Sequence, residues 1–167
     1  KLSLADFPTQ VVLNMKSVDL RLAIYQPDIP QNLGSMIRLG ACFGVHIDII
    51  GPCGFPFSKT ALRRTAMDYL NIAKITHHQS YEFFKSNITD SRRLVLLTVQ
   101  SAVNIWDFKF KPTDTIMVGR ESAGVPEAIR REIKNQIKIP LVASARCLNV
   151  SNAASIAIAE ARRQSGF

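Results

Sequence analysis

Short apolar runs alternate with segments of helical spacing along most of this 167-residue chain, and this alternation limits the possible folds most strongly. The runs predicted as strands are mostly apolar throughout and cover residues 21–25, 45–50, 69–75, 93–99, 115–119 and 136–141. The segments predicted as helices are residues 33–44, 59–67, 80–87, 126–133 and 149–164. Continuously apolar strands are typical of parallel sheets that are buried on both faces. The pattern therefore predicts an α/β fold with a mainly parallel sheet and helices on both faces.

Residues with strong positional preferences mark the ends of several predicted helices. Asn32 is expected to cap the first helix and Gly44 to end it. Ser58 is expected to cap the second helix, which is short and basic. Pro126 is expected in the first turn of the fourth helix, where its missing N–H has no cost.

The charge of the chain favours a polyanionic partner. Lys and Arg number 21 against 13 Asp and Glu, which gives a net charge of +8. Such an excess is typical of proteins that bind nucleic acid, although a soluble basic protein without such a partner is the alternative. No apolar run reaches the ~20 residues that span a bilayer, so we expect no membrane association.

The length and the cysteine content fit one domain in a reducing compartment. We expect residues 1–20 to form an N-terminal tail and residues 21–167 to form a single domain. The tail begins with Lys1 rather than Met, so we expect it to be trimmed or to carry added residues. It has no apolar core of the secretory kind, which favours a cytoplasmic location. The three cysteines are odd in number and widely spaced, which argues against a disulfide framework and a Cys-based zinc site. We therefore expect no metal.

Three loops that follow predicted strands are the candidates for a shared site. They cover residues 26–32, 119–125 and 141–148, and each carries polar residues or glycine. Ligands of parallel α/β sheets bind at the carboxyl ends of the strands, where such loops meet. The chain has no G-x-G-x-x-G, no P-loop and no G-x-S-x-G motif. These absences favour group transfer from an already activated donor.

The three loop regions together resemble a known family. The segments "PQNLGSMIRL", "VGRESAGVP" and "IPLVASARCLNVSNAASIAIAEA" are similar to the three motifs of the SPOUT class of S-adenosylmethionine-dependent RNA 2′-O-methyltransferases. The segments "LRRTAMDY" and "EARRQSG" further resemble the short members that methylate the wobble nucleotide of tRNA. The resemblance covers about residues 21–166. It implies a deep trefoil knot in the C-terminal part and a homodimer whose active site draws on both chains.

The resemblance also implies an activity. We expect transfer of a methyl group from S-adenosylmethionine to the ribose 2′-OH of a tRNA nucleotide, namely the wobble pyrimidine of the anticodon. Two alternatives stay open: a ribosomal RNA 2′-O-methyltransferase of the same class, and a non-catalytic RNA-binding protein that retains the fold. The expected partners are tRNA and a second copy of the chain, with neither DNA nor a membrane.

By the same resemblance, the methyl donor is held mainly by backbone groups of the three loops. The positions expected to bind it are Leu97, Gly119, Ile139, Cys147, Leu148 and Ser151. Gly119 has no side chain and so permits a close backbone approach. Cys147 stands where the related motif usually has Ser, and Ala123 where close relatives often have Arg.

Four residues are expected to act in catalysis: Arg38, Asn32, Glu121 and Asn149. Arg38 matches the arginine that the family is usually drawn as using to activate the ribose hydroxyl. A guanidinium with a pKa above about 12 is a poor base, so we favour electrostatic stabilisation of the developing oxyanion. Asn32 is expected to orient the loop or the ribose, and Glu121 to pair with a basic residue such as Arg38 of the partner subunit. The alternative for Asn32 and for Asn149 is helix capping, and for Glu121 it is simple solvation.

Basic residues and small residues complete the predicted surface and core. Arg63, Arg64 and Arg146, with Arg162 and Arg163, are expected to bind RNA phosphates, although each taken singly fits a solvated surface position. The last helix is rich in small residues, namely Ala153, Ala154, Ser155 and Ala157. A larger residue there would overpack a closely approached helix by roughly 1–3 kcal/mol.

Overall fold

A computed structural model of the chain describes residues 18–57, 66–88 and 92–166. Its six strands are β1 (Arg21–Tyr25), β2 (His46–Ile50), β3 (Ile75–His78), β4 (Leu94–Leu97), β5 (Thr115–Val118) and β6 (Asn135–Ile137). They form one sheet of order β3-β2-β1-β5-β4-β6. All pairings between these strands are parallel, as predicted.

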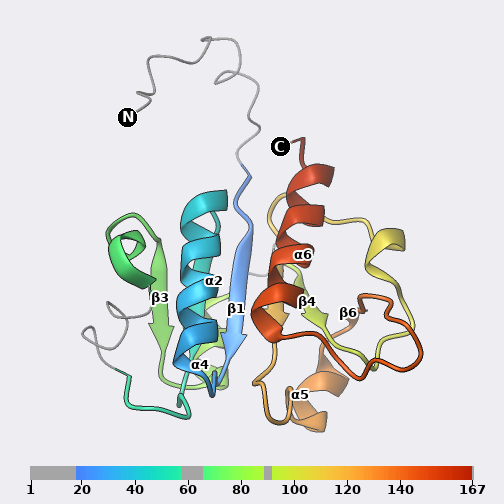
Figure 1. Ribbon diagram of the computed structural model, residues 1–167, viewed down its shortest axis with the longest axis horizontal. Coiled ribbons are helices and arrows are strands. Elements are labelled where there is room, and N and C mark those ends of the chain that lie inside the picture. The colour runs from blue at the N-terminus through green and yellow to red at the C-terminus, as the bar shows by residue number, and fades with distance from the viewer. Residues whose placement is uncertain (1–17, 58–65, 89–91, 167) are drawn as a thin grey trace.

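Helices cover both faces of the sheet, which confirms the predicted fold class (Figure 1). They are α2 (Pro30–Phe43), α4 (Tyr81–Asn87), α5 (Glu127–Glu132) and α6 (Val150–Gln164), with short 3₁₀ helices η2 (Met67–Asn71) and η3 (Ile105–Asp107). The side chains of strand β1 alternate between the two faces of the sheet, and they are buried on both. Leu22 and Ile24 belong to the apolar cluster that contains α2 and α6, whereas Ala23 and Tyr25 belong to the cluster of α4.

Small residues of α6 face the core beside α2. Ala154, Ala157 and Ala161 are fully buried and share an apolar cluster with Leu33 and Ile37 of α2. An alanine leaves little more than backbone at the surface of a helix, so the neighbouring side chains can approach α6 closely. Of the four small residues named from the sequence, Ala154 and Ala157 lie in the core, whereas Ala153 and Ser155 are half-buried.

The predicted start of the first long helix was wrong by three residues. Helix α2 begins at Pro30, and the residue before it, Ile29, has no side-chain capping bond. Proline is favoured at the first helical position because its φ is already helical and it needs no N–H partner. Asn32 therefore lies inside the first turn and is not the N-cap. The predicted end is confirmed, since Gly44 follows the helix with a left-handed φ of 63°.

The strand predicted over residues 69–75 was also largely wrong. Residues 67–71 form the 3₁₀ helix η2, and β3 begins only at Ile75. Leu70 and Ala73, three residues apart, both pack against the apolar core, which a helical turn permits and an extended strand does not. The helix predicted over residues 59–67 falls mostly outside the described residues.

Two further boundaries moved. Strand β6 ends at Ile137, because Lys138 forms only an isolated bridge with Asn104 instead of continuing the strand. Pro126 is the N-cap of α5 rather than a residue of its first turn.

The strand order creates a switch point beside β1. From β1 the chain adds β2 and β3 on one side, and it later places β5 on the other side. At such a point the loops that follow the two neighbouring strands leave the sheet in opposite directions. A crevice for ligands therefore opens at the carboxyl ends of these strands. The C-terminal trefoil knot stays a prediction. In the described residues, no helix combines the length and the apolarity needed to cross a membrane.

Candidate active site at the carboxyl ends of the strands

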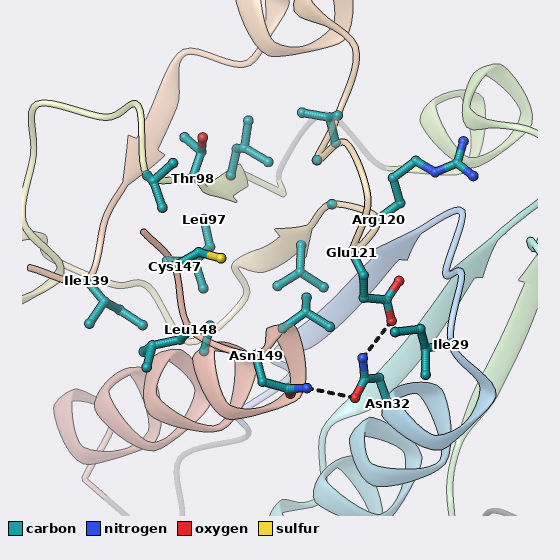
Figure 2. Close-up of a pocket in the computed structure, with 18 of the residues that line it drawn as sticks. Ile29, Asn32, Leu97, Thr98, Arg120, Glu121, Ile139, Cys147, Leu148 and Asn149 are labelled. Atoms are coloured by element: carbon teal, nitrogen blue, oxygen red, sulfur yellow. Dashed lines mark hydrogen bonds between the residues drawn. The ribbon is translucent and has the colours of Figure 1, made fainter. Parts of the chain in front are cut away.

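A cavity of about 420 Å³ lies at the carboxyl ends of β4 and β5 and is bordered by the start of α6. All three loops predicted to share a site contribute to its lining, as do the residues that end β4. One side of the cavity is apolar, with Leu97, Ile139 and Leu148 among its residues, and the other carries Asn32 and Glu121 (Figure 2). Its size lies in the range of about 300–1,000 Å³ that is usual for small-molecule sites.

Most of the residues predicted to bind the donor or to act in catalysis line this cavity. They are Asn32, Leu97, Gly119, Glu121, Ile139, Cys147, Leu148 and Asn149. Two predicted residues, Arg38 and Ser151, are not among the lining residues. The sequence therefore located the cavity, while the role of each residue stays a prediction.

A relay of three polar side chains joins the loops on one side of the cavity. Asn32 Nδ2 donates to Glu121 Oε1 at 2.9 Å, and Asn149 Nδ2 donates to Asn32 Oδ1 at 3.0 Å (Figure 2). Asn32 is buried, so these bonds satisfy polar atoms that would otherwise be costly to remove from water. The relay connects the first turn of α2, the loop after β5 and the start of α6.

Asn149 both caps a helix and contacts the relay. Its Oδ1 accepts from the backbone N–H of Ser151 at 2.9 Å and from that of Asn152 at 3.4 Å, while its Nδ2 reaches Asn32. The capping role, which the sequence left as one alternative, is confirmed, and the opposite end of the amide is free to bond Asn32, while a role in orienting the site stays a prediction. Ser151 also donates its hydroxyl to Asn149 Oδ1 at 2.6 Å, so its side chain contacts the relay rather than the cavity.

Glu121 accepts hydrogen bonds from neutral donors in the described part of the chain. Besides Asn32, the backbone N–H of Asp28 donates to Glu121 Oε2 at 2.8 Å. Within the residues that the structure describes, neither bond to Glu121 comes from a basic side chain, so the expected pairing stays a prediction. Both oxygens of the carboxylate are nevertheless held, so its orientation is fixed.

An ion pair that the sequence analysis missed lies next to this relay. Arg120 Nη2 donates to Asp28 Oδ1 at 2.5 Å, and Ser122 donates to Asp28 Oδ2 through its backbone N–H at 3.1 Å and its hydroxyl at 2.5 Å. Hydrogen bonds from Arg120 and then from Ser122 hold the pKa of the Asp28 carboxyl well below its usual range. The same bond raises the pKa of Arg120. Opposite charges follow two strands, but only the adjacency of β1 and β5 reveals that they meet.

Gly119 is required by the loop that it opens. A Cβ at this position would lie 2.5 Å from the carbonyl carbon and 2.6 Å from the Cα of Gly124. The loop folds back on itself, because Arg120 and Gly124 exchange backbone hydrogen bonds of 3.1 and 2.8 Å. The close approach expected from the sequence therefore includes one from the chain's own backbone.

Arg38 lies outside the cavity of its own chain. It is exposed on α2, and its guanidinium carbon lies 4.7 Å from the centre of the Tyr69 ring, a cation–π geometry. Its side chain is thus presented on the outer surface of the chain.

The arginines predicted to bind RNA differ in their position and exposure. Arg63 and Arg64 lie outside the described residues, and Arg146 is exposed. Arg163 is largely exposed and pairs with Glu160 at 2.8 Å. For Arg162 the prediction was wrong: it is only 5% exposed, because it lies one turn after the buried Ile158 on the core side of α6.

Fold and cavity together define an α/β protein with a small-molecule pocket at the switch point of a parallel sheet. A family model described as the SpoU rRNA Methylase family matches residues 19–159. The chain belongs to this family, which confirms the resemblance seen in the three motifs.

Several proteins are similar to the chain over most of its length. A tRNA (cytidine(34)-2'-O)-methyltransferase of Beijerinckia indica is 48% identical over 146 residues, which cover 87% of this chain and 91% of that protein. A protein of the same name from Escherichia coli K12 is 35% identical and covers 89% of this chain and 95% of its own.

Solved structures of RNA methyltransferases are also similar to the chain. One described as "Structural insights into the 2-OH methylation of C/U34 on tRNA" superposes with a TM-score of 0.86 at 31% identity, over 91% of this chain and 100% of that chain. An AdoMet-bound rRNA methyltransferase from Sinorhizobium meliloti superposes with a TM-score of 0.77 at 25% identity, over 89% of this chain and 57% of that chain.

Proposed function

We propose that the chain transfers a methyl group from S-adenosylmethionine to the ribose 2′-OH of the wobble pyrimidine, nucleotide 34, of tRNA. One observation carries the proposal: the three motif loops, far apart in sequence, line a single pocket at the switch point of the sheet. Relatives named for methylation of tRNA cytidine 34 support the choice of RNA and position. The net charge of +8 suits a polyanionic substrate, and with tRNA as that substrate we place the chain in the cytoplasm.

The lining of the pocket fits an adenosine-containing donor. Apolar side chains of Leu97, Ile139 and Leu148 offer a surface for a flat aromatic base. Backbone segments at Gly119 and Cys147 reach the cavity, where main-chain N–H and C=O groups can read the edge of a base. S-adenosylmethionine bound there would supply a methyl group activated by its positively charged sulfur. The ribose oxygen would take this methyl group as the sulfur–carbon bond breaks, S-adenosylhomocysteine would leave, and the hydroxyl proton would pass to water.

The residues of the relay orient the site rather than move protons. Asn32 and Asn149 are amides without a titrating group, and both side chains are held by the hydrogen bonds described above. Glu121 brings negative charge to the same side of the cavity. The two fixed amide dipoles favour a transition state because they need no reorganisation when charge develops, and the negative charge of Glu121 suits a cationic partner there.

Arg38 is proposed to serve a pocket that two copies of the chain build together. Its guanidinium is exposed on α2 outside its own chain's cavity and carries a charge that the proposed chemistry requires. In a homodimer that pairs α2 with the other copy's site, Arg38 of the partner subunit stabilises the developing oxyanion.

Methyl transfer from labelled S-adenosylmethionine to total tRNA, followed by nucleoside mapping, tests the proposal. We expect label in a 2′-O-methylated nucleotide 34. The variant Arg38→Ala lowers turnover by roughly 10²–10⁴ with donor binding near normal, which is the usual range for loss of one catalytic group. Arg131→Ala is the matched control, because it removes an exposed arginine of α5 that pairs with Glu127 and is not among the cavity-lining residues.

Other outcomes distinguish the alternatives. The description of the family and the Sinorhizobium meliloti structure make ribosomal RNA the second candidate substrate. Label on ribosomal RNA and not on tRNA would select it. Failure to bind the donor in calorimetry would favour a non-catalytic RNA-binding protein, and Cys147→Ser would then be the first variant to restore binding.

A further inference from the structure

We infer that Asp28 is a positioning residue, whose carboxylate locks the loop 119–124 in the place that the donor pocket requires. The inference rests on the proposed function only in taking the pocket as a donor site. Nothing in the three sequence motifs singles Asp28 out, and its side chain does not line the cavity.

The carboxylate of Asp28 binds one loop at several points. Arg120 donates to both of its oxygens, through Nη2 at 2.5 Å and through Nε at 3.3 Å. Ser122 adds its backbone N–H and its hydroxyl at 3.1 and 2.5 Å. Charge-assisted bonds of this kind are roughly twice as strong as neutral ones. Two residues that flank Glu121 are therefore both tied to Asp28.

Glu121 closes the clamp in the opposite direction. Its carboxylate accepts from the backbone N–H of Asp28 at 2.8 Å, and also from Asn32. Each loop thus offers a carboxylate to the other, and the side chain of Asp28 can be altered without removing the bond from its backbone. This separation allows the clamp to be tested apart from the relay.

The loop held by Asp28 forms one wall of the pocket. Gly119, Arg120, Glu121 and Gly124 all line the cavity, although the Arg120 guanidinium itself points away from it (Figure 2). The exchange of backbone bonds between Arg120 and Gly124 stiffens the loop internally. A stiff loop that is released moves as a unit, so loss of the clamp displaces the whole wall.

Asp28 is also supported from the opposite side. The backbone N–H of Gly54, in the loop after β2, donates to the carbonyl of Pro27 at 2.9 Å. A Cβ at Gly54 would lie 2.8 Å from Asp28 Oδ1 and 3.1 Å from Asp28 Cα. The loop at Asp28 is therefore packed between the loops that follow β2 and β5. Gly54→Ala should push Asp28 toward a new position while its carboxylate is kept.

Calorimetric binding of S-adenosylhomocysteine, together with steady-state kinetics, tests the inference. In Asp28→Asn an NH₂ group replaces one of the two accepting oxygens. This group faces hydrogen-bond donors of Arg120 and Ser122 and cannot accept from them, so the clamp opens. We expect the Kd for S-adenosylhomocysteine and the KM for the donor to rise about tenfold, while the KM for RNA is unchanged. Gly54→Ala should raise the same Kd, and Asp28→Glu should bind more tightly than Asp28→Asn. The matched control is Asp107→Asn, an exposed aspartate of η3.

Two results would overturn the inference: a wild-type Kd in folded Asp28→Asn, or an equal rise in Asp107→Asn. If Asp28→Asn does not fold, Ser122→Ala removes only one hydroxyl donor and must raise the Kd about threefold, or the inference fails. A wild-type chain that binds no S-adenosylhomocysteine would refute the donor site and the inference together. Donor binding that depends on Asp28, with label on an RNA other than tRNA, would refute only the proposed substrate.

Discussion

Replacement of Gly119 by alanine gives the sharpest test of how the pocket is built. The added Cβ would lie within 2.6 Å of two backbone atoms of Gly124 and 2.9 Å from the backbone nitrogen of Val125. Backbone atoms cannot turn away as the end of a flexible side chain can, so the loop must shift. Overpacking of this kind costs about 1–3 kcal/mol, which for a chain of this size lowers the melting temperature by roughly 3–10 °C.

The same strain should appear in donor binding. A donor that needs the original loop position must restore it, and about 1–3 kcal/mol corresponds to a Kd raised about 5- to 150-fold. Calorimetry with S-adenosylhomocysteine measures this Kd, at a temperature where circular dichroism shows the variant to be folded.

A second glycine supplies the control. Gly44 has a left-handed φ of 63° and nothing within 4 Å of an added Cβ, so Gly44→Ala loses about 1–2 kcal/mol through backbone strain alone. It lies at the end of α2, away from the cavity lining. We expect Gly44→Ala to lose stability and keep donor affinity. Wild-type affinity in Gly119→Ala would refute the argument that the close approach to Gly124 shapes the pocket.

Four further variants, at three positions, test other parts of the structure. Asn149→Ala removes a cap and should cost about 1 kcal/mol of folding free energy in denaturant titration, whereas Asn149→Ser should keep the cap and yet lose the bond to Asn32, so that both lower methyl transfer. Ala157→Leu should destabilise by about 1–3 kcal/mol, because the position is fully buried. Hydrogen bonds from Arg163 lower the pKa of Glu160 to about 2 from an ordinary value of 4.5, so its contribution to stability is complete above pH 4.5 and is lost as the pH falls toward 2. Glu160→Gln should therefore be less stable than the wild type at pH 7 and equal to it near pH 2 in urea titrations, and an equal difference at both values would contradict this.

The sequence predicted most of the fold because its strands are apolar along their whole length. That signal was strong for β1, β2 and β5, which lie in the interior of the sheet. It was weak over residues 69–75, where the apolar spacing fitted a helical turn as well as a strand. Pro30 displaced the expected cap because its preference for the first helical position outweighs a polar residue two places later.

The sequence predicted which residues lie at the site more fully than it predicted which of them contact one another. The motif loops were found because each follows a strand, and in a parallel sheet such loops meet at one edge. The clamp between Asp28 and Arg120 could not be found this way, because the sequence does not say that β1 and β5 are neighbours. Arg162 was misplaced because its charge outweighed its position one turn beyond Ile158.

The long-range bonds of the relay determine when, during folding, the protein can first bind its donor. The bond between Asn32 and Asn149 joins residues that are 117 positions apart, and the bond between Asn32 and Glu121 spans 89. Contacts of such long range form late, since the chain entropy between them must first be lost. A chain emerging from the ribosome therefore carries its first motif long before it has a pocket, and it gains the pocket only when α6 docks. Donor at about 100 times its Kd would then stabilise the folded full-length chain by about 2.7 kcal/mol and leave incomplete nascent chains unaffected.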